Sequence, residues 1–306
     1  MASKITNNTD NGAGRCHFKI INALVIDGSG KPGKKADIAV ESDRIVAIGE
    51  LQNWSADETI DASGYIASPG FIDVHTHDDL AALNTRDMSF KVSQGVTSVI
   101  AGNCGLSLAP FESGKGFPPP FPILGNESDF VFPRVADYRA KFESAPAALN
   151  LALLAGHSSM RVTVMGESLQ QGASKKQIEA MREILRCALR DGCIGVSTGL
   201  DYPPAIESTT SEIVEIASVL KEFDNRIYVS HIRNEADQVL EAIEETLEIG
   251  RRASTAVVIS HHKCSGPKNY GRSVETLAAI ESGRAQQRVG LDVYPYIASS
   301  TTYNKP

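Results

Sequence analysis

From about residue 65 onward, the chain alternates short apolar runs with amphipathic stretches. Apolar, strand-length runs occur at residues 65–77, 96–105, 150–157, 192–200, 226–235, 255–263 and from 289. Helical periodicity separates most of them; in 174–192 apolar residues recur every three or four positions, and Ser174 with Gln177 has the spacing of a capping box. Seven strand–helix alternations predict a parallel sheet.

Two closures fit this order, an open doubly wound sheet or a (β/α)₈ barrel. No GxGxxG motif follows the first strand, the polar residues able to do chemistry follow the ends of several different strands, and no switch point interrupts the order. These observations favour a TIM-type barrel. Only seven of eight strands are predicted, so we expect an α/β fold whose barrel is incomplete at the C-terminus.

The residues before the barrel have another pattern. Residues 1–16 are polar and predict a flexible tail. Residues 17–64 are rich in β-formers and turns, and predict a small β unit with too few strands to form a core alone. The barrel domain would then cover 65–306. Within it, the Pro/Gly-rich segment 108–133 predicts a lid.

Composition narrows the classes of function. The 306 residues carry a net charge of −7, which argues against binding to nucleic acid or to an anionic membrane surface. No apolar run reaches the ~18 residues of a membrane span, and the N-terminus lacks the apolar stretch of a secretory signal. The five cysteines are widely spaced without a CxxC motif, so we expect a cytoplasmic protein without a disulfide framework.

Histidines supply the candidate chemistry, because six of the seven lie at or near predicted strand ends. His75 and His77 are two residues apart, so in a strand their rings would share one side. Such a pair alone is also common as two solvated histidines. Cys104, in GNCG, would supply a thiolate, and imidazole and thiolate are the ligands of zinc. For His157 we favour a structural hydrogen bond to the backbone over a ligand role.

The motifs PGFIDVHTHDD, GVTSVIAGNCGLSLAP, GHSSMR, GLDYPPA, VSHIRNE, ISHHK and DVYPYIASSTT follow one another in the chain. In this order they closely resemble the N-acyl-D-amino-acid deacylases (D-aminoacylases) of the amidohydrolase superfamily, from about residue 17 to the last residue. His-x-His is shared across the superfamily, whereas GNCG and SHHK are specific to this branch. The resemblance implies a (β/α)₈ barrel joined to a small β-sandwich, part of which residues 17–64 would form.

The resemblance also implies a metal site. Cys104, His231 and His261 would hold one tightly bound Zn²⁺. His75 and His77, together with Cys104, would line a second and weaker metal position.

The substrate would be a small molecule, an N-acyl-D-amino acid. By the same resemblance, Lys263, Tyr294 and Ser300 would hold its carboxylate, and Tyr202 would lie near it.

The family's catalytic aspartate stands at the end of the eighth strand and has no counterpart within the 306 residues. We therefore leave the catalytic residue unassigned and expect a truncated chain with impaired activity. Asp292 is not taken as a substitute. Arg233 and Glu235, which follow His231, are candidates to support the metal ligands without binding the metal, but no role is assigned to them.

The function implied is zinc-dependent hydrolysis of the amide bond of N-acyl-D-amino acids to a carboxylate and a D-amino acid. A cyclic-amide hydrolase, such as a dihydroorotase or hydantoinase, is an alternative; GNCG and the lack of an obvious bridging-lysine motif argue against it. A catalytically dead scaffold is a third hypothesis. The missing eighth strand supports it, and the intact metal-ligand residues oppose it.

Overall fold

The computed structural model describes residues 13–111, 114–166 and 168–301. The chain divides into two compact units, Met1–Gly70 and Phe71–Pro306, which are treated separately below. Most of the predicted tail, residues 1–16, lies outside the described residues, and Arg15 already begins the first strand.

The first unit is a five-stranded sheet. Its strands are β1 (Arg15–Val25), β2 (Lys34–Glu41), β3 (Arg44–Gly49), β4 (Ser55–Asp61) and β5 (Ile66–Ala67). Antiparallel pairing joins β1 to β2 and β2 to β3, whereas β4 and β5 pair with β1 in parallel. A small core of Cys16, Ala39, Ala47 and Leu51 lies against this sheet.

The start of the barrel differs from the sequence-based prediction. Residues 65–67 belong to the first sheet, because Leu24 N donates to Tyr65 O and Ile26 N donates to Ala67 O. Pro69 interrupts the pairing because proline has no N–H to donate. The first strand of the second unit therefore begins at Phe71, and it is only three residues long.

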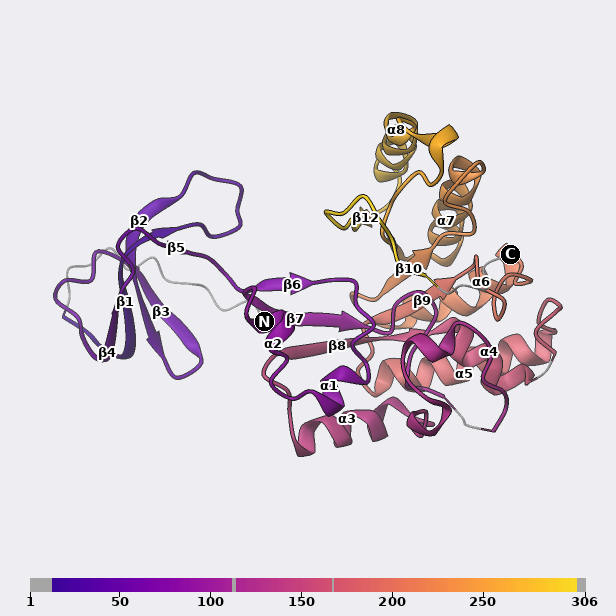
Figure 1. The fold of residues 1–306 in the computed structure, drawn as a ribbon, viewed down its shortest axis with the longest axis horizontal. Helices are drawn as coiled ribbons and strands as arrows, with labels where there is room; N and C mark the ends of the chain where they lie inside the picture. Colours follow the sequence, from indigo (N-terminus) through magenta and orange to yellow (C-terminus); the bar gives the residue numbers. More distant parts are fainter. Residues whose placement is uncertain (1–12, 112–113, 167, 302–306) are drawn as a thin grey trace. The chain divides into compact units, whose positions relative to one another are not determined.

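The second unit is a curled parallel sheet of seven strands, as predicted, and forms part of a TIM-type barrel (Figure 1). The strands are β6 (Phe71–Asp73), β7 (Val96–Ala101), β8 (Asn150–Gly156), β9 (Gly195–Gly199), β10 (Ile227–His231), β11 (Ala256–Ile259) and β12 (Val289–Leu291). They pair in chain order from β6 to β12. All seven strands point in one direction, so their C-terminal ends meet at one edge of the sheet.

Helices follow most of these strands. They are α1 (Ala81–Asn84), α2 (Ser89–Val92), α3 (Val135–Ser144), α4 (His157–Met165), α5 (Lys175–Arg190), α6 (Thr210–Ala217), α7 (Val239–Ala253) and α8 (Ser273–Arg284). Ser174 and Gln177 form the predicted capping box of α5. Helix α4 was not predicted, and it makes His157 the first residue of a helix. Within the described residues, no helix is long and apolar enough to cross a membrane.

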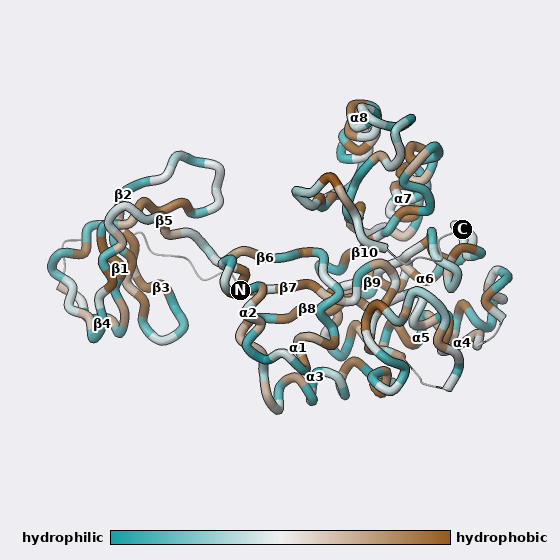
Figure 2. The backbone as a smooth tube through the Cα atoms, viewed as in Figure 1, coloured by the Kyte–Doolittle hydropathy of each residue, from teal (hydrophilic) through white to brown (hydrophobic). Residues whose placement is uncertain are grey.

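One large hydrophobic core holds most of the second unit together, and a smaller cluster of Met88, Val99 and Leu149 lies beside its first strands. Figure 2 shows hydrophobic stretches along strands of both units, with hydrophilic residues in many connecting loops. Parts of the segment predicted as a lid, 108–133, pack into this core. Phe111, Phe121 and Phe130 are almost fully buried there, with ring centroids 4.9 to 5.6 Å apart. Such spacing is typical of favourable aromatic packing.

A buried ionic cluster joins α4 to α6. Arg161 and Glu212 form an ion pair inside the core, and both side chains are at most 1% exposed. His157 Nε2 lies 3.4 Å from the same carboxylate, and Ala173 N donates to it. Burial lowers the pKa of His157, so its ring is neutral near pH 7 and Arg161 supplies the positive charge. The backbone bond expected for His157 is not found: neither ring nitrogen has a hydrogen-bond partner within the described residues, and the ring contacts Glu212 instead.

The stability that this cluster contributes depends on pH through the carboxyl group of Glu212. Burial alone would raise its pKa, but the contact with His157 and the charges facing it outweigh burial and lower the pKa from 4.5 to about 2. Since the folded-state pKa lies below the unfolded one, the stabilisation is complete above about pH 4.5. It is lost as the pH falls towards 2.

We predict that Glu212→Gln lowers the free energy of unfolding at pH 7 by about 3 kcal/mol, because Arg161 then remains buried without a counter-charge. The difference from wild type should shrink between pH 4.5 and 2, where Glu212 itself becomes protonated. Urea unfolding followed by circular dichroism measures both. Glu183→Gln, which alters an exposed pair with Arg186, is the control and should cost less than about 0.5 kcal/mol. A loss for Glu212→Gln that does not vary with pH would contradict the assignment.

Candidate metal centre

The predicted metal ligands gather at the C-terminal edge of the parallel sheet. His231 is the last residue of β10, and His261 follows β11 by two residues. Strand β6 ends at Asp73, so His75 and His77 lie in the loop that follows. The same-side argument for an extended strand therefore does not apply to this pair. Their rings are nevertheless neighbours, with centroids 5.8 Å apart.

Cys104 comes from a tight turn after β7. Its φ of 54° is left-handed, as are those of Gly102 at 80° and Gly105 at 75°. A Cβ on Gly102 would lie 2.1 Å from Leu154 O, and one on Gly105 would lie 2.8 Å from Gly199 N. Only glycine allows the turn to press this closely against β8 and β9. The GNCG motif is thus the geometry that brings the thiol to the strand ends.

Asp79 fixes the turn from the other side. Its two carboxylate oxygens accept hydrogen bonds from Gly102 N at 3.3 Å and Leu108 N at 3.2 Å. Burial, partly offset by these bonds, raises the pKa of Asp79 to about 6. Thus the second aspartate of the HTHDD motif acts on the Cys104 loop and does not face the ligand groups.

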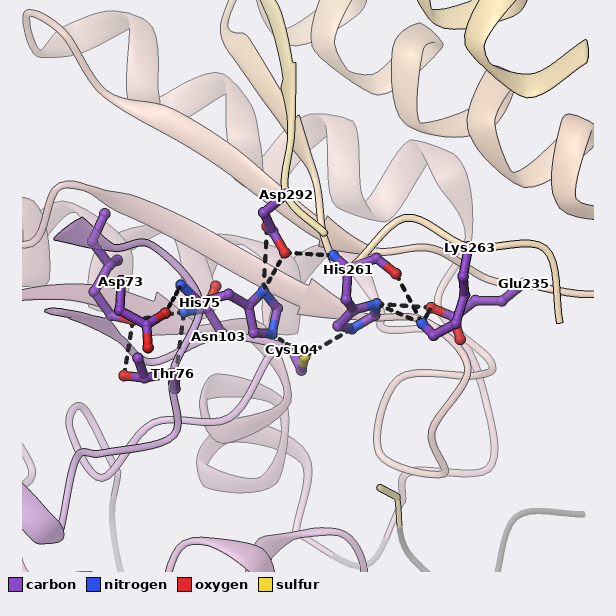
Figure 3. Close-up of polar contacts among 10 residues, drawn as sticks. Asp73, His75, Thr76, Asn103, Cys104, Glu235, His261, Lys263 and Asp292 are labelled. Atoms are coloured by element: carbon purple, nitrogen blue, oxygen red, sulfur yellow. Dashed lines mark hydrogen bonds and ion pairs between the residues drawn. The ribbon is translucent and has the colours of Figure 1, made fainter. Parts of the chain in front are cut away.

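Two groups of donor atoms share Cys104. One contains His75, His77 and Cys104, the other Cys104, His231 and His261, and within each group the donor atoms lie within 4.8 Å of one another. Cys104 Sγ is 3.3 Å from His75 Nε2 and 3.4 Å from His261 Nε2 (Figure 3). The structure therefore brings all five predicted metal residues together, in the two sets expected from the resemblance. Their metal-binding role itself stays a prediction.

Unpartnered nitrogens suit these groups to a cation. Neither ring nitrogen of His231, which is 4% exposed, makes a hydrogen bond within the described residues; its closest acid is Asp201, 3.8 Å from Nε2. His77 Nδ1 is likewise buried without a hydrogen-bond partner among the described residues. Buried polar atoms normally have partners, so these nitrogens are free to bind an ion. Imidazole nitrogen with thiolate sulfur is a donor set that suits zinc.

The electrostatics favour neutral imidazoles at His77 and His261. Burial lowers the pKa of His77 to about 3 and that of His261 to about 4, so their lone pairs are available at neutral pH. Burial, reinforced by the charges of Glu235 and Asp292, raises the pKa of the Cys104 thiol. A divalent cation beside the sulfur would oppose this effect and favour the thiolate.

The predicted substrate residues line the same cavity of about 1120 Å³ as the two donor groups. Lys263 Nζ lies 5.6 Å from the centre of the Tyr294 ring. The ring of Tyr202 lies 4.7 Å from that of His231, and its hydroxyl group is 3.1 Å from Thr301 Oγ1. Ser300 also lines the cavity. The structure thus places all four around the donor groups, and their contacts with a substrate stay a prediction.

Two carboxylates left without a role by the sequence analysis also belong to this site. Glu235 Oε1 lies 2.8 Å from His261 Nδ1 and 2.5 Å from Lys263 Nζ. Asp292 lies 3.3 Å from His75 Nδ1 and accepts a hydrogen bond from His261 N at 2.6 Å. Asp292 directly follows β12, so the rule that functional residues follow parallel strands could have identified it. Glu235 is four residues beyond β10 but closes the predicted strand-length run 226–235, so the same rule pointed to it as well.

Both carboxylates are ionised at neutral pH. Burial alone would raise the pKa of Glu235, but the hydrogen bond with His261 and the nearby positive charges outweigh it and hold the pKa well below 4.5. For Asp292, the contact with His75 and the bond from the His261 main chain likewise outweigh burial and lower the pKa.

Comparison with known proteins agrees with this fold. The profile of the amidohydrolase family matches residues 58–304. A D-aminoacylase from Alcaligenes xylosoxydans xylosoxydans is 48% identical over 92% of this chain and 58% of its own length. A solved D-aminoacylase structure, described for the role of its binuclear metal centre, has 45% identity and a TM-score of 0.90 over 94% of this chain and 60% of that one. The N-acyl-D-glutamate deacylase of Bordetella bronchiseptica, solved with zinc and a phosphonate inhibitor, has 43% identity and a TM-score of 0.90 over the same shares.

The parallel sheet, the gathering of donor residues at its C-terminal edge and these matches define the class of protein. The chain belongs to the amidohydrolase family. It spans about 60% of the length of the relatives it resembles, among them deacylases that act on N-acyl-D-amino acids.

We predict that Gly102→Ala destabilises the second unit by about 3 kcal/mol or more, because it combines a left-handed conformation with a clash against Leu154 O. Gly271→Ala is the matched control: its φ is also left-handed, at 87°, but no atom lies within 4 Å of an added Cβ. That variant should lose only about 1 kcal/mol. Urea midpoints of both variants decide the matter, and equal losses would show that contact with β8 does not shape the turn.

Proposed function

We propose that this protein is a zinc-dependent hydrolase of N-acyl-D-amino acids, releasing a carboxylate and a D-amino acid. One observation carries the proposal: two groups of thiol and imidazole donors share Cys104 inside a cavity of about 1120 Å³. The similarity to D-aminoacylase and to N-acyl-D-aspartate and N-acyl-D-glutamate deacylases supports the choice of substrate class.

In this proposal Cys104, His231 and His261 hold one zinc ion tightly, and His75 and His77 with Cys104 form a second, weaker position. The buried nitrogens of His231 without hydrogen bonds in the described residues support the first assignment. When bound, zinc polarises an amide carbonyl and lowers the pKa of a water molecule towards ~7.

The protein's own residues would bind and orient the substrate. Lys263 is a cation at the cavity wall, suited to the substrate carboxylate. Its ammonium group has three N–H donors, of which Glu235 Oε1 and His261 O accept two, at 2.5 and 3.0 Å. In this proposal the third donor binds the ligand, although Nζ also lies 2.9 Å from His261 Nδ1. Tyr294, beside Lys263, and Ser300 would complete the carboxylate site, and Tyr202 would pack beside the substrate.

We also propose a cytoplasmic location, since all five cysteines are free thiols. The partner required is a small molecule only; the net charge of −7 supports neither nucleic acid nor anionic membrane as a further partner.

The metal assignment predicts that the purified protein binds zinc and that Cys104→Ala removes binding at both groups, because both depend on its sulfur. His231→Ala should weaken only the tighter zinc and His77→Ala only the weaker one. Titration against a chromophoric chelator, with metal content measured in parallel, tests this.

Cys187→Ala is the control for this prediction, since Cys187 is exposed and lies in neither donor group. It should bind zinc as wild type does. Zinc content that is unchanged in Cys104→Ala would refute the site.

The substrate assignment predicts that the zinc-loaded protein binds and hydrolyses N-acetyl-D-methionine in preference to its L-enantiomer. Lys263→Met should lower the affinity for the D-enantiomer by about 10- to 100-fold, the loss of one charge-assisted hydrogen bond. Calorimetry measures binding, and release of the free amine measures turnover. Turnover of dihydroorotate without turnover of the N-acyl-D-amino acid would overturn the proposal in favour of a cyclic-amide hydrolase. A protein that binds zinc but neither binds nor turns over the N-acyl-D-amino acid or dihydroorotate would favour a scaffold.

A further inference from the structure

The two imidazoles that flank Cys104 have matching surroundings. His75 and His261 each direct Nε2 at the sulfur, at 3.3 and 3.4 Å. Their other ring nitrogens each face a carboxylate, Asp292 for His75 and Glu235 for His261 (Figure 3). Both carboxylates are under 10% exposed, at 9% and 8%. Among the residues that the structure describes, neither carboxylate belongs to a donor group that could itself hold a metal ion.

Each carboxylate accepts a hydrogen bond and so determines which ring nitrogen carries the proton. An ionised carboxylate can only accept, so the nitrogen that faces it carries a proton; in a neutral ring Nδ1 is then protonated and Nε2 keeps the lone pair. That lone pair points at the sulfur shared by both groups. Carboxylates in this relation to metal-binding histidines fix the orientation of the ring and strengthen its binding.

His261 is also held through its main chain. Its φ of 34° is left-handed, which an L-residue adopts at an energetic cost. Asp292 Oδ1 accepts the hydrogen bond from His261 N at 2.6 Å, and His262 N donates to Asp292 O at 2.8 Å. Asp292 therefore acts on both donor groups: it contacts the ring of His75 and stabilises the backbone that carries His261.

Lys263 offers an alternative for His261, since Nζ is 2.9 Å from Nδ1. If Nδ1 accepted from this ammonium group, the ring proton would lie on Nε2 and point at Cys104. The negative charge of Glu235 between the two groups favours the other arrangement, in which the carboxylate accepts from both the ring and the ammonium. The two arrangements predict opposite orders of effect for variants at 235 and 263.

We propose that Glu235 and Asp292 are positioning residues that hold the Nδ1 atoms of His261 and His75, and so aim both Nε2 atoms at one metal-binding centre. This inference rests on the proposed zinc binding and adds to it two residues outside the ligand set.

The test is zinc affinity, measured by chelator competition on the full chain. Glu235→Gln and Asp292→Asn, which keep side-chain volume but remove the charge, should each weaken zinc binding by about 10- to 100-fold. Lys263→Met should weaken it less than Glu235→Gln does. In protein loaded with Co²⁺, the thiolate-to-metal absorption band should change in the first two variants, because the imidazoles beside the sulfur are no longer held.

Asp191→Asn is the matched control. Asp191 is 11% exposed, pairs with Arg134 and accepts a hydrogen bond from Ala136 N, so it resembles Asp292 but lies away from the cavity. Its zinc affinity and cobalt spectrum should equal those of wild type. Circular dichroism reports the folded fraction of each sample. A variant that loses its folded signal is replaced by Glu235→Asp or Asp292→Glu, for which an intermediate loss of affinity is expected.

The outcomes distinguish a failure of the proposed zinc binding from a failure of the positioning role. If the wild-type protein binds no zinc, the proposed function is refuted. If the wild-type protein binds zinc and the zinc affinities of Glu235→Gln and Asp292→Asn lie within about twofold of wild type, only the positioning role is refuted. If Lys263→Met binds zinc more weakly than Glu235→Gln does, Lys263 and not Glu235 is the residue that holds the ring of His261.

Discussion

The site depends on one constraint, the left-handed turn that carries Cys104. The thiol reaches the C-terminal edge of the sheet because Gly102 and Gly105 allow the main chain to press against β8 and β9. Asp79 then holds the turn through Gly102 N and Leu108 N. Without this turn, the histidines at the end of β10 and in the loops after β6 and β11 would face one another with no shared donor between them. The direction of the parallel strands brings the imidazoles together, and the turn supplies the sulfur.

Much of this arrangement could be predicted from the sequence. The period of apolar residues predicted seven parallel strands, and the order of the motifs identified the family. The same order singled out Cys104 and the four histidines that the structure gathers around it. These predictions succeed because strand direction and residue order determine what meets at the sheet edge. They needed no knowledge of side-chain contacts.

Contacts between distant side chains could not be predicted in the same way. Residues 65–67 were assigned to the barrel because their apolar pattern continues into β6, but their main chain pairs with β1. His157 was expected to bond to the backbone, whereas a glutamate 55 positions later supplies its partner. Glu235 and Asp292 were left without roles because their importance lies in which ring nitrogen they face. That property appears only when three-dimensional distances are known.

Sharing one sulfur between two donor groups also creates a chemical liability. Oxidation of Cys104 to a sulfenic or sulfinic acid would remove a ligand from both groups in one event. The protein's defence is the environment of the thiol, which is 5% exposed and whose pKa is raised by burial. Oxidants react with thiolates far faster than with thiols, so the sulfur resists them unless a cation lies beside it. The burial that raises the pKa of the Cys104 thiol thus also protects the sulfur from oxidation.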